Sequence, residues 1–342
     1  MAEAPVRTAG RAAARLRRLI RLTLSLLTVL LLTAAIGPLI VPIPPLEGTL
    51  PPEQLAGPDS RFVEAAGVRL HALASGSGEP GVVLLHGFLA STYSWREVFE
   101  PLAARGLALA FDRPAFGLTE RPMPEAWGAV NPYTSEAQVR QTLDLLDAFG
   151  LERAVLIGNS SGGTLALRLA LDHPERVAGL VLVDAAVYEA GGTPAWIRPL
   201  LDTPQARRLG PWVLRGVRQW GLDFARAAWH DPTLITPDVW EGYLLPLRAE
   251  NWDRALWEFT LAGRAPDLTG RLGEVVAPTL VLSGDDDRIV PPDLSRRLAQ
   301  EIPGARLVVL PACGHAPQEE CPASFLEAVL PFLQGLAPAA RP

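Results

Sequence analysis

Short apolar runs alternate with amphipathic stretches along most of the chain, from about residue 61 to residue 336. The apolar runs have the length of strands buried on both faces, and they lie at 82–86, 107–112, 154–158, 180–184, 279–283 and 307–310. Stretches with Leu or Ala at helical spacing lie at 95–105, 135–149, 161–172, 293–301 and 322–333. This alternation predicts a mostly parallel sheet flanked by helices. Runs 62–66 and 68–74, which turn at Gly67, predict an antiparallel hairpin at one sheet edge.

One long stretch, residues 187–273, breaks this alternation because it contains no clear strand. It holds seven of the nine tryptophans, namely Trp196, Trp212, Trp220, Trp229, Trp240, Trp252 and Trp257. We interpret it as a helical cap inserted into an α/β core made of residues 61–186 and 274–337. The aromatic rings of such a cap either line an apolar pocket over the sheet or hold short helices against the core, and the pattern leaves both roles open.

The N-terminal part of the chain has a different pattern, since residues 22–43 carry no charged side chain. A helix of this length crosses a hydrocarbon core of about 30 Å. Six arginines and one glutamate lie in residues 1–21. The positive-inside rule therefore predicts a single-pass signal anchor, with residues 1–21 in the cytoplasm and the body on the extracytoplasmic side of the membrane.

Two other interpretations of residues 22–43 stay open. A cleaved signal peptide would give a secreted protein, although Thr33-Ala34-Ala35 matches a cleavage site poorly. A buried core helix is disfavoured by the arginine cluster beside so long an apolar run. Residues 44–60 are rich in proline and glycine, which predicts a tether without helix or strand that holds the body a short distance from the membrane.

Composition and charge exclude two classes of protein. With 49% hydrophobic and 20% charged residues among 342, the chain can bury a sizeable core and is unlike a disordered protein. The formal net charge is -6, from 31 basic and 37 acidic residues. Because six of the basic residues and one of the acidic residues lie in residues 1–21, the rest of the chain carries a net charge of −11. A body this acidic argues against a nucleic-acid partner, which needs a basic face.

The clearest chemical motif follows the apolar run 154–158. Residues Gly158 to Gly162 read G-N-S-S-G and lead directly into a helical stretch, which satisfies G-x-S-x-G in a strand-turn-helix context. The glycines allow a turn too sharp for side chains, so the hydroxyl of Ser160 is pushed clear of the backbone. The N-terminus of the following helix favours negative charge at this point. Ser160 is therefore the candidate nucleophile.

A serine hydroxyl needs a base that is oriented by a third group. The run 279–283 is followed by Asp285, Asp286 and Asp287, and the last apolar run is followed by Gly314-His315. These residues give the chain order Ser, Asp, His. Acid and base then lie at the carboxyl ends of strands, where open α/β sheets place their sites.

These residues also carry a resemblance that covers about residues 61–336. The chain resembles the α/β-hydrolase superfamily of esterases, epoxide hydrolases and C–C bond hydrolases. The matching motifs are L-L-H-G-F at 84–88, D-R-P-A-F-G at 112–117, the turn around Ser160, residues 284–291 and Gly314-His315.

The resemblance implies roles for further residues. It favours Asp287 as the acid, with Asp285 and Asp286 as solvated loop carboxylates, while Asp184 is the alternative acid because some relatives take it from the preceding strand. It also implies that the backbone N–H groups of Phe88 and Ser161 form an oxyanion hole, and that His86 is a structural hydrogen-bonding residue.

The expected activity is hydrolysis of carboxylic esters of small apolar or aromatic substrates through an acyl-enzyme on Ser160, with no cofactor. Epoxide hydrolases and haloalkane dehalogenases carry Asp where this chain has Ser160, which disfavours their chemistry. A C–C hydrolase of ring-cleavage products and a non-catalytic ligand-binding protein of the same fold are the alternatives. Asn159 either orients the turn or is a polar residue that tolerates it.

The remaining candidates concern cysteines and metals. Cys313 and Cys321 are the two cysteines of the chain; in an exported protein they are permitted to form a disulfide, but the spacing does not require one. No metal site is expected, because His71, His173 and His230 are scattered and the aspartates at 285–287 lack the spacing of a calcium loop.

Overall fold

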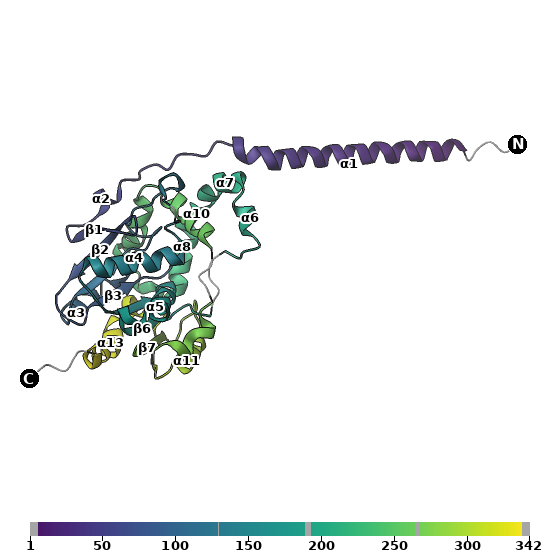
Figure 1. Ribbon diagram of the computed structural model, residues 1–342. Helices are drawn as coiled ribbons and strands as arrows, with labels where there is room; N and C mark the ends of the chain where they lie inside the picture. The colour runs from purple at the N-terminus through teal and green to yellow at the C-terminus, as the bar shows by residue number, and fades with distance from the viewer. Residues whose placement is uncertain (1–5, 129, 189–192, 264–266, 337–342) are drawn as a thin grey trace, which may run out of the picture.

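The computed structural model describes residues 6–128, 130–188, 193–263 and 267–336 (Figure 1). Its centre is an eight-stranded sheet with the order β1-β2-β4-β3-β5-β6-β7-β8. The strands are β1 Ser60–Ala65, β2 Val68–Ser75, β3 Val82–Leu85, β4 Ala108–Phe111, β5 Ala154–Asn159, β6 Val177–Val183, β7 Thr279–Gly284 and β8 Arg306–Leu310. The predicted hairpin is confirmed, since β1 pairs antiparallel with β2, and β2 pairs antiparallel with β4. All pairs from β4 to β8 are parallel.

Alternate residues of the central strands point into two separate apolar layers. Val83, Leu85 and Leu156 pack with the helices α4 (Ser135–Ala148), α5 (Ser161–Asp172) and α11 (Pro292–Glu301). Val82, Leu84 and Val155 pack with α3 (Phe99–Ala103) and α13 (Pro322–Leu336) on the other face. Because both faces are covered, these strands are apolar at consecutive positions, as the sequence pattern predicted.

The prediction of a helix at 95–105 is wrong in its extent. The chain instead forms a 3-10 turn, η1 Thr92–Trp95, and the short helix α3, which begins at Phe99. Pro101 explains the difference, because proline lacks the N–H of an interior helical residue and is tolerated in the first turn.

The described residues between 193 and 263 contain helices and no strand. They are α6 Arg198–Leu201, α7 Pro204–Leu214, α8 Val217–Ala228, α9 Pro237–Leu244 and α10 Trp252–Ala262. The tryptophans of this region take different roles. Trp229, Trp252 and Trp257 are buried, and the ring of Trp257 fills the space beside Gly210, so it packs α7 against α10, whereas Trp196 and Trp212 are exposed.

The N-terminal helix α1 runs from Val6 to Ile40 and projects from the body (Figure 1). It therefore includes arginines of the predicted cytoplasmic segment, and it ends three residues before the predicted boundary at residue 43. Pro42 accounts for that end, because a residue preceding proline disfavours helical backbone. The segment Ala14–Ile40 has a mean hydropathy of 2.2 over its most apolar window and none of that window is buried, so it is a candidate membrane span or signal sequence.

The predicted tether is not a free spacer. A short helix, α2 Pro52–Leu55, lies within it, and Leu50 forms an isolated parallel bridge with Ala249 of the cap. The guanidinium of Arg215 donates to the carbonyl oxygen of Pro44 at 2.6 Å. Prolines cannot donate from their backbone nitrogen, but their carbonyl oxygens still accept hydrogen bonds. Residues 41–56, which we call the strap, therefore lie along the cap.

Candidate active site

The nucleophile candidate lies at the tight turn between β5 and α5. Ser160 has φ 53° and ψ −120°, a strained conformation for a residue with a side chain. The turn requires small neighbours, since a Cβ on Gly158 would collide with the backbone at Gly162, and one on Gly162 would collide with the carbonyl oxygen of Leu85. The turn predicted from G-x-S-x-G is thus present, with Ser160 immediately before the helix.

The base and acid candidates are joined by a short hydrogen bond. His315 Nδ1 lies 2.7 Å from Asp287 Oδ2, and both residues are 4% exposed. The other oxygen of Asp287 accepts the backbone N–H groups of Ile289 at 2.7 Å and Val290 at 2.9 Å. These bonds fix the carboxylate, which in turn fixes the imidazole. Asp285 is exposed and Asp286 pairs with His230 and Arg288, as expected for loop carboxylates.

His315 and Ser160 lie at a shared cavity. His315 Nε2 is buried and makes no hydrogen bond within the described part of the chain. Both Ser160 and His315 line one cavity of about 140 Å³. Asn159 connects the turn to the base, because its Nδ2 donates to the carbonyl oxygen of His315 at 2.9 Å. The structure thus brings Ser160, His315 and Asp287 together from three loops that follow β5, β8 and β7.

Asp184, the alternative acid, lies beside this group but does not hold the imidazole. It is fully buried, has φ 44°, and accepts hydrogen bonds from Ser283 Oγ at 2.7 Å and from the N–H of Gly284 at 3.2 Å. Burial, with the neighbouring Asp287 carboxylate, raises the pKa of Asp184 well above its usual value. A raised pKa favours the neutral carboxyl, whereas an acid that stabilises an imidazolium acts as a carboxylate.

The two oxyanion candidates come from two segments that meet at the Ser160 turn. Phe88 follows β3, and Ser161 is the first residue of α5. Neither backbone N–H donates a hydrogen bond to another group among the described residues. The loop approaches the turn closely, because a Cβ on Gly87 would lie 3.2 Å from Ser160 Cβ. Two free donors beside a candidate nucleophile are the arrangement that stabilises a tetrahedral oxyanion.

His86 has the structural environment that the sequence analysis expected. Its Nε2 accepts the backbone N–H of Arg113 at 2.9 Å, and its Nδ1 lies 2.8 Å from the carbonyl oxygen of Gly87. Burial, together with the Arg113 charge, lowers the pKa of His86 to about 4. The ring is therefore neutral at pH 7, and both of its nitrogens are occupied.

The cavity is lined mainly by apolar side chains. They come from the core loops and from the cap, and include Phe88, Phe116, Val217, Leu222, Phe224, Trp229, Trp240, Leu244, Trp252 and Leu256. The charged residues in its wall are Arg121 and Glu319. The terminal nitrogens of Arg121 donate to backbone carbonyls, whereas its buried Nε has no partner in the described chain. The site therefore suits a largely apolar molecule.

Glu319 is a buried carboxyl that the sequence analysis missed. Its oxygens accept hydrogen bonds from the side chains of Ser94 and Arg96 of the core and from Tyr243 of α9, the last at 2.8 Å. Burial raises the pKa of Glu319, and the charge of Arg96 opposes this only in part. Glu319 thus ties the cap to the segment that follows His315. No local pattern marks it, since its partners lie more than 70 residues away in the chain.

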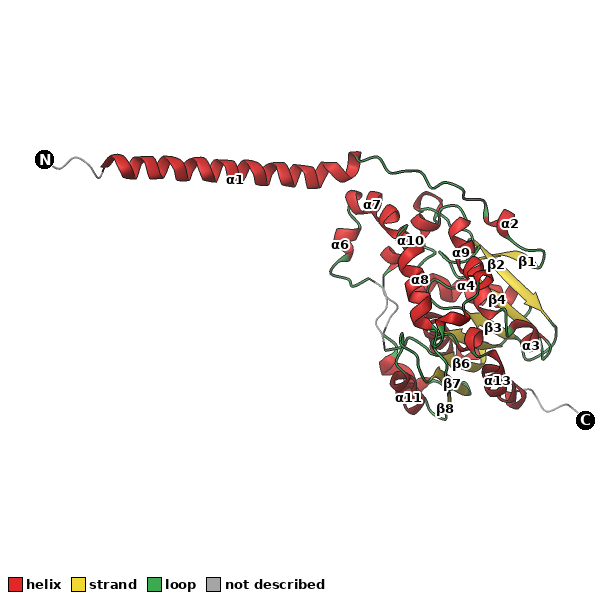
Figure 2. Cartoon of the chain, turned by 180° about the vertical axis from the view of Figure 1, so that it is seen from behind, coloured by secondary structure: helices red, strands yellow, loops and turns green. Residues whose placement is uncertain are grey.

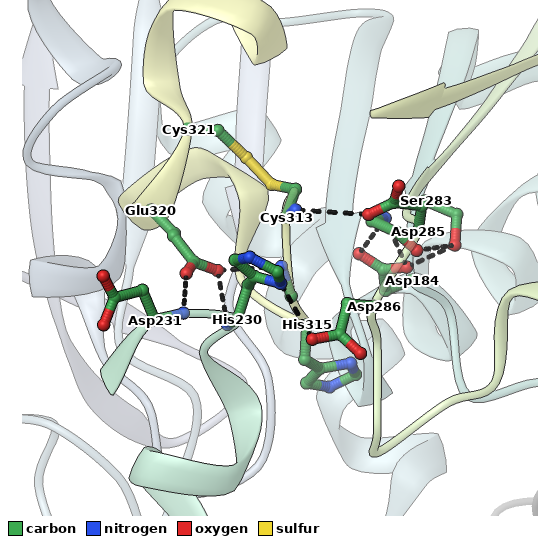
Figure 3. Close-up of a disulfide and its surroundings, with 12 residues drawn as sticks. Asp184, His230, Asp231, Ser283, Asp285, Asp286, Cys313, His315, Glu320 and Cys321 are labelled. Atoms are coloured by element: carbon green, nitrogen blue, oxygen red, sulfur yellow. Dashed lines mark hydrogen bonds and ion pairs between the residues drawn. A yellow bond between two sulfur atoms is a disulfide. The ribbon is translucent and has the colours of Figure 1, made fainter. Parts of the chain in front are cut away.

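The loop that carries His315 is also fixed by a disulfide (Figure 3). Cys313 and Cys321 are bonded, with their Cα atoms 6.3 Å apart. Within the loop, Glu320 accepts the backbone N–H groups of Gly314 at 2.8 Å and His230 at 2.9 Å. The bond that the sequence permitted is present, and it connects the residue two before His315 to the residue before α13.

Asp184, Asp287 and His315 are also the group of described residues whose ligand atoms lie close enough together to hold a metal, within 4.8 Å of one another. Their hydrogen bonds already account for the cluster, because Asp287 orients His315 and Ser283 holds Asp184. Hydrogen bonds within the protein thus hold each of these three side chains in place.

A second Ser-His-Asp arrangement lies at β1 and β2. His71 Nε2 lies 2.8 Å from Ser60 Oγ, and His71 Nδ1 lies 2.7 Å from Asp112 Oδ2. This group lacks the geometry of the first one. Ser60 is the first residue of a strand, its own N–H donates to the carbonyl oxygen of Gly57, and no helix begins beside it. It fixes the edge of the sheet rather than presenting a nucleophile next to free N–H donors.

Comparisons with known proteins agree with this architecture. Residues 82–328 match the model of the alpha/beta hydrolase family. A 2-hydroxy-6-oxononadienedioate/2-hydroxy-6-oxononatrienedioate hydrolase from Cupriavidus pinatubonensis is 32% identical over 277 residues, which cover 78% of this chain and 90% of that protein.

Two solved structures are also similar. A thermophilic esterase from Thermogutta terrifontis superposes with a TM-score of 0.63 at 28% identity, covering 81% of this chain and 99% of its own. A bacterial membrane phospholipase A superposes with a TM-score of 0.63 at 25% identity and covers 94% of this chain and 100% of its own. With the family model matched over most of its length, this chain belongs to the alpha/beta hydrolase family.

Proposed function

We propose that the chain is a serine-dependent carboxylic ester hydrolase for apolar substrates. Ser160 Oγ attacks the ester carbonyl carbon while His315 Nε2 accepts its proton. The N–H groups of Phe88 and Ser161 donate to the resulting oxyanion, and Asp287 stabilises the imidazolium. The His315 imidazolium then gives this proton to the departing alcohol as the ester C–O bond breaks, and the acyl group stays on Ser160 as an acyl-enzyme. A water molecule, deprotonated by His315, then releases the carboxylic acid.

The observation that carries this proposal is the shared apolar cavity. Ser160 and His315 both line it, and its walls are mainly aromatic and aliphatic. Transfer of a long or aromatic acyl group from water to such a surface lowers its free energy and favours binding. The esterase and phospholipase neighbours support an ester substrate, and the phospholipase similarity extends over nearly the whole chain.

The direct test replaces Ser160. We expect Ser160→Ala to lower kcat on a p-nitrophenyl ester by at least about 10⁴-fold, since the nucleophile is lost. Ser75→Ala, on the far part of β2, is the matched control and should keep full activity. Circular dichroism and thermal melting of both variants should match the unchanged protein. Retained turnover in Ser160→Ala would remove Ser160 from the mechanism.

C–C bond hydrolysis is the second candidate, favoured by two observations. The curated relative at 32% identity is named for cleavage of a dioate, and Arg121 in the cavity wall has a buried Nε without a partner in the described chain. A panel of apolar esters and a 2-hydroxy-6-oxo-dienoate distinguishes the two. Higher kcat/KM on esters supports the first proposal, whereas higher kcat/KM on the dienoate supports the second. Turnover of neither compound would favour a ligand-binding role.

We also propose that α1 anchors the body to a membrane. The uncharged length of the helix, its exposure and the arginines at its N-terminal end support this. Intact mass of the protein from the membrane fraction is the test. A soluble product that begins near Gly37 would indicate a cleaved signal peptide instead.

A further inference from the structure

Five large apolar side chains of the cap are exposed to solvent within a short stretch of chain. They are Trp196, which is 81% exposed, Leu200, Trp212, Val213 and Trp220. They come from the segment before α6, from α6 itself, from the end of α7 and from α8. Leu200 and Val213 are each 65% exposed, so they do not pack on the core. Exposed tryptophans and aliphatic residues gathered in this way mark a surface that is covered by something else.

The same stretch is basic although the body is acidic. Residues 193–220 contain five arginines and one acidic residue, Asp202, which Arg207 already binds at 2.7 Å. Arg198, Arg208 and Arg218 are exposed and form no ion pair with the described residues. A surface that combines tryptophan with unpaired arginine fits the boundary of an anionic lipid bilayer.

The position of this stretch relative to α1 points to the same partner. Gln205 Nε2 donates to the carbonyl oxygen of Ala35, within the apolar span, at 2.9 Å. Arg208 donates to the carbonyl oxygen of Val41, just past the end of α1, at 3.1 Å. Figures 1 and 2 both place α7 beside the C-terminal end of α1, with α6 next to it, on the side of the body from which α1 projects. A bilayer crossed by α1 would therefore meet α6 and α7.

We propose that residues 193–220, which we call the membrane face, rest on the anionic bilayer that α1 spans. Trp196, Trp212 and Val213 would enter the boundary between head groups and acyl chains, and Arg208 and Arg218 would bind lipid phosphates. The proposal goes beyond ester hydrolysis, and it rests on the membrane insertion of α1. A second copy of the chain is a poorer occupant, because a symmetric contact would bring the unpaired arginines of both copies, Arg198, Arg208 and Arg218, onto one interface.

The membrane face continues into the wall of the catalytic cavity. Helix α8 begins three residues after the end of α7, and its residues Val217, Leu222 and Phe224 line the cavity. A cap that rests on lipid would therefore hold one wall of the cavity next to the bilayer.

Site-directed fluorescence on the full chain tests this placement. The two native cysteines are bonded to each other, so a cysteine introduced by Val213→Cys provides a single thiol for an environment-sensitive dye. The labelled protein is reconstituted in vesicles of phosphatidylcholine and phosphatidylglycerol. We expect blue-shifted emission and an iodide quenching constant at least about fivefold lower than at Val276→Cys. Val276 is the matched control, because it is 75% exposed and precedes β7 by three residues, and Figure 1 shows β7 far from α1.

A third label, introduced by Leu27→Cys in the apolar span, separates the possible failures. If Leu27→Cys is protected from iodide and Val213→Cys is quenched like Val276→Cys, the membrane face is free and the proposal is wrong. If Leu27→Cys is also quenched, α1 is not inserted and the premise of the proposal fails. Turnover of a p-nitrophenyl ester by each labelled protein reports on the hydrolase proposal independently.

Two further measurements identify what protects residue 213. Arg208→Glu with Arg218→Glu should raise quenching at residue 213 in vesicles with phosphatidylglycerol, whereas the same positions changed to lysine should not. Protection that disappears when the protein is diluted in lipid would show that a second copy covers this surface, and it would overturn the proposal.

Discussion

At the scale of single residues, two neighbouring aspartates differ in which group they bind. Asp287 holds His315 at 2.7 Å, whereas Asp184 is held by Ser283 and Gly284. We expect Asp287→Asn to lower kcat by about 10³- to 10⁴-fold, because the imidazolium loses its carboxylate. Asp184→Asn keeps the shape of a side chain that is bound by Ser283 and Gly284 and not by His315, so kcat should fall less than about tenfold. Ester hydrolysis by the two variants measures this, and the reverse order would assign the acid to Asp184.

His86 links stability to pH, also at the residue scale. The unfolded chain takes up a proton at this ring near pH 6.5, whereas the folded chain does so only near the lowered pKa of about 4. The unfolded state therefore binds more protons between these values, and the contribution of His86 to stability is lost as the pH falls through them. The full effect is about 3 kcal/mol.

The variant His86→Gln keeps a hydrogen-bond donor and an acceptor but does not titrate. Its free energy of unfolding should therefore fall less than that of the unchanged protein between pH 6.5 and pH 4. Denaturant titrations at several pH values measure the difference. Parallel pH profiles would contradict the buried, neutral state of His86.

Much of the candidate site was predictable from local sequence, since the turn around Ser160 and the chain order of acid and base depend on short motifs. The preference for Asp287 over Asp184 came from the family resemblance, because both residues follow neighbouring parallel strands and the local pattern does not separate them. In the structure, Asp287 is the one that is hydrogen-bonded to His315. The role of Glu319 could not be predicted from the sequence either, because it depends on contacts with Arg96 and Tyr243, which lie in distant parts of the chain.

At the scale of elements, Arg215, which directly follows α7, links the strap to the cap. Arg215 Nε donates to the buried carboxylate of Asp253 at 2.8 Å, and its terminal nitrogen donates to the carbonyl of Pro44. We expect Arg215→Met to lower the free energy of unfolding by about 2 kcal/mol or more, because Asp253 is left buried without its cation. Arg218→Met, three residues later and free of ion pairs among described residues, is the control and should change it by less than about 0.5 kcal/mol. Equal stability of both variants would show that the contact contributes nothing.

Elements were predicted best where burial fixes the pattern. The strands β3, β4, β5 and β7 lie within one residue of the predicted apolar runs, because both of their faces are covered, whereas β6 begins at Val177, three residues before its predicted run. The helix expected at 95–105 failed because Pro101 restricts where it begins. The strap differed from the expected tether because its bridge to Ala249 and its bonds to cap arginines join segments about 170 to 200 residues apart.

At the scale of the whole molecule, the chain consists of a hydrolase body and an N-terminal helix that is a candidate membrane span. The cap of the body contacts this helix through α7. The net charge of -6 conceals three regions: a basic N-terminus, an acidic body and a basic stretch at 193–220 inside that body. The first two were visible in the sequence. The position of the third was not, because a local excess of arginine does not by itself indicate which surface it faces. The structure places this stretch beside the end of α1 through α7.

Covalent labelling with a fluorophosphonate, followed by peptide mapping, tests the central claim most directly. Two Ser-His-Asp arrangements lie within the described residues, and of these two the one at Ser160 has free N–H donors beside the serine. The account predicts one adduct, on Ser160, which is absent from Ser160→Ala and slowed in Asp287→Asn. An adduct on Ser60, or no adduct on a folded protein, would contradict it.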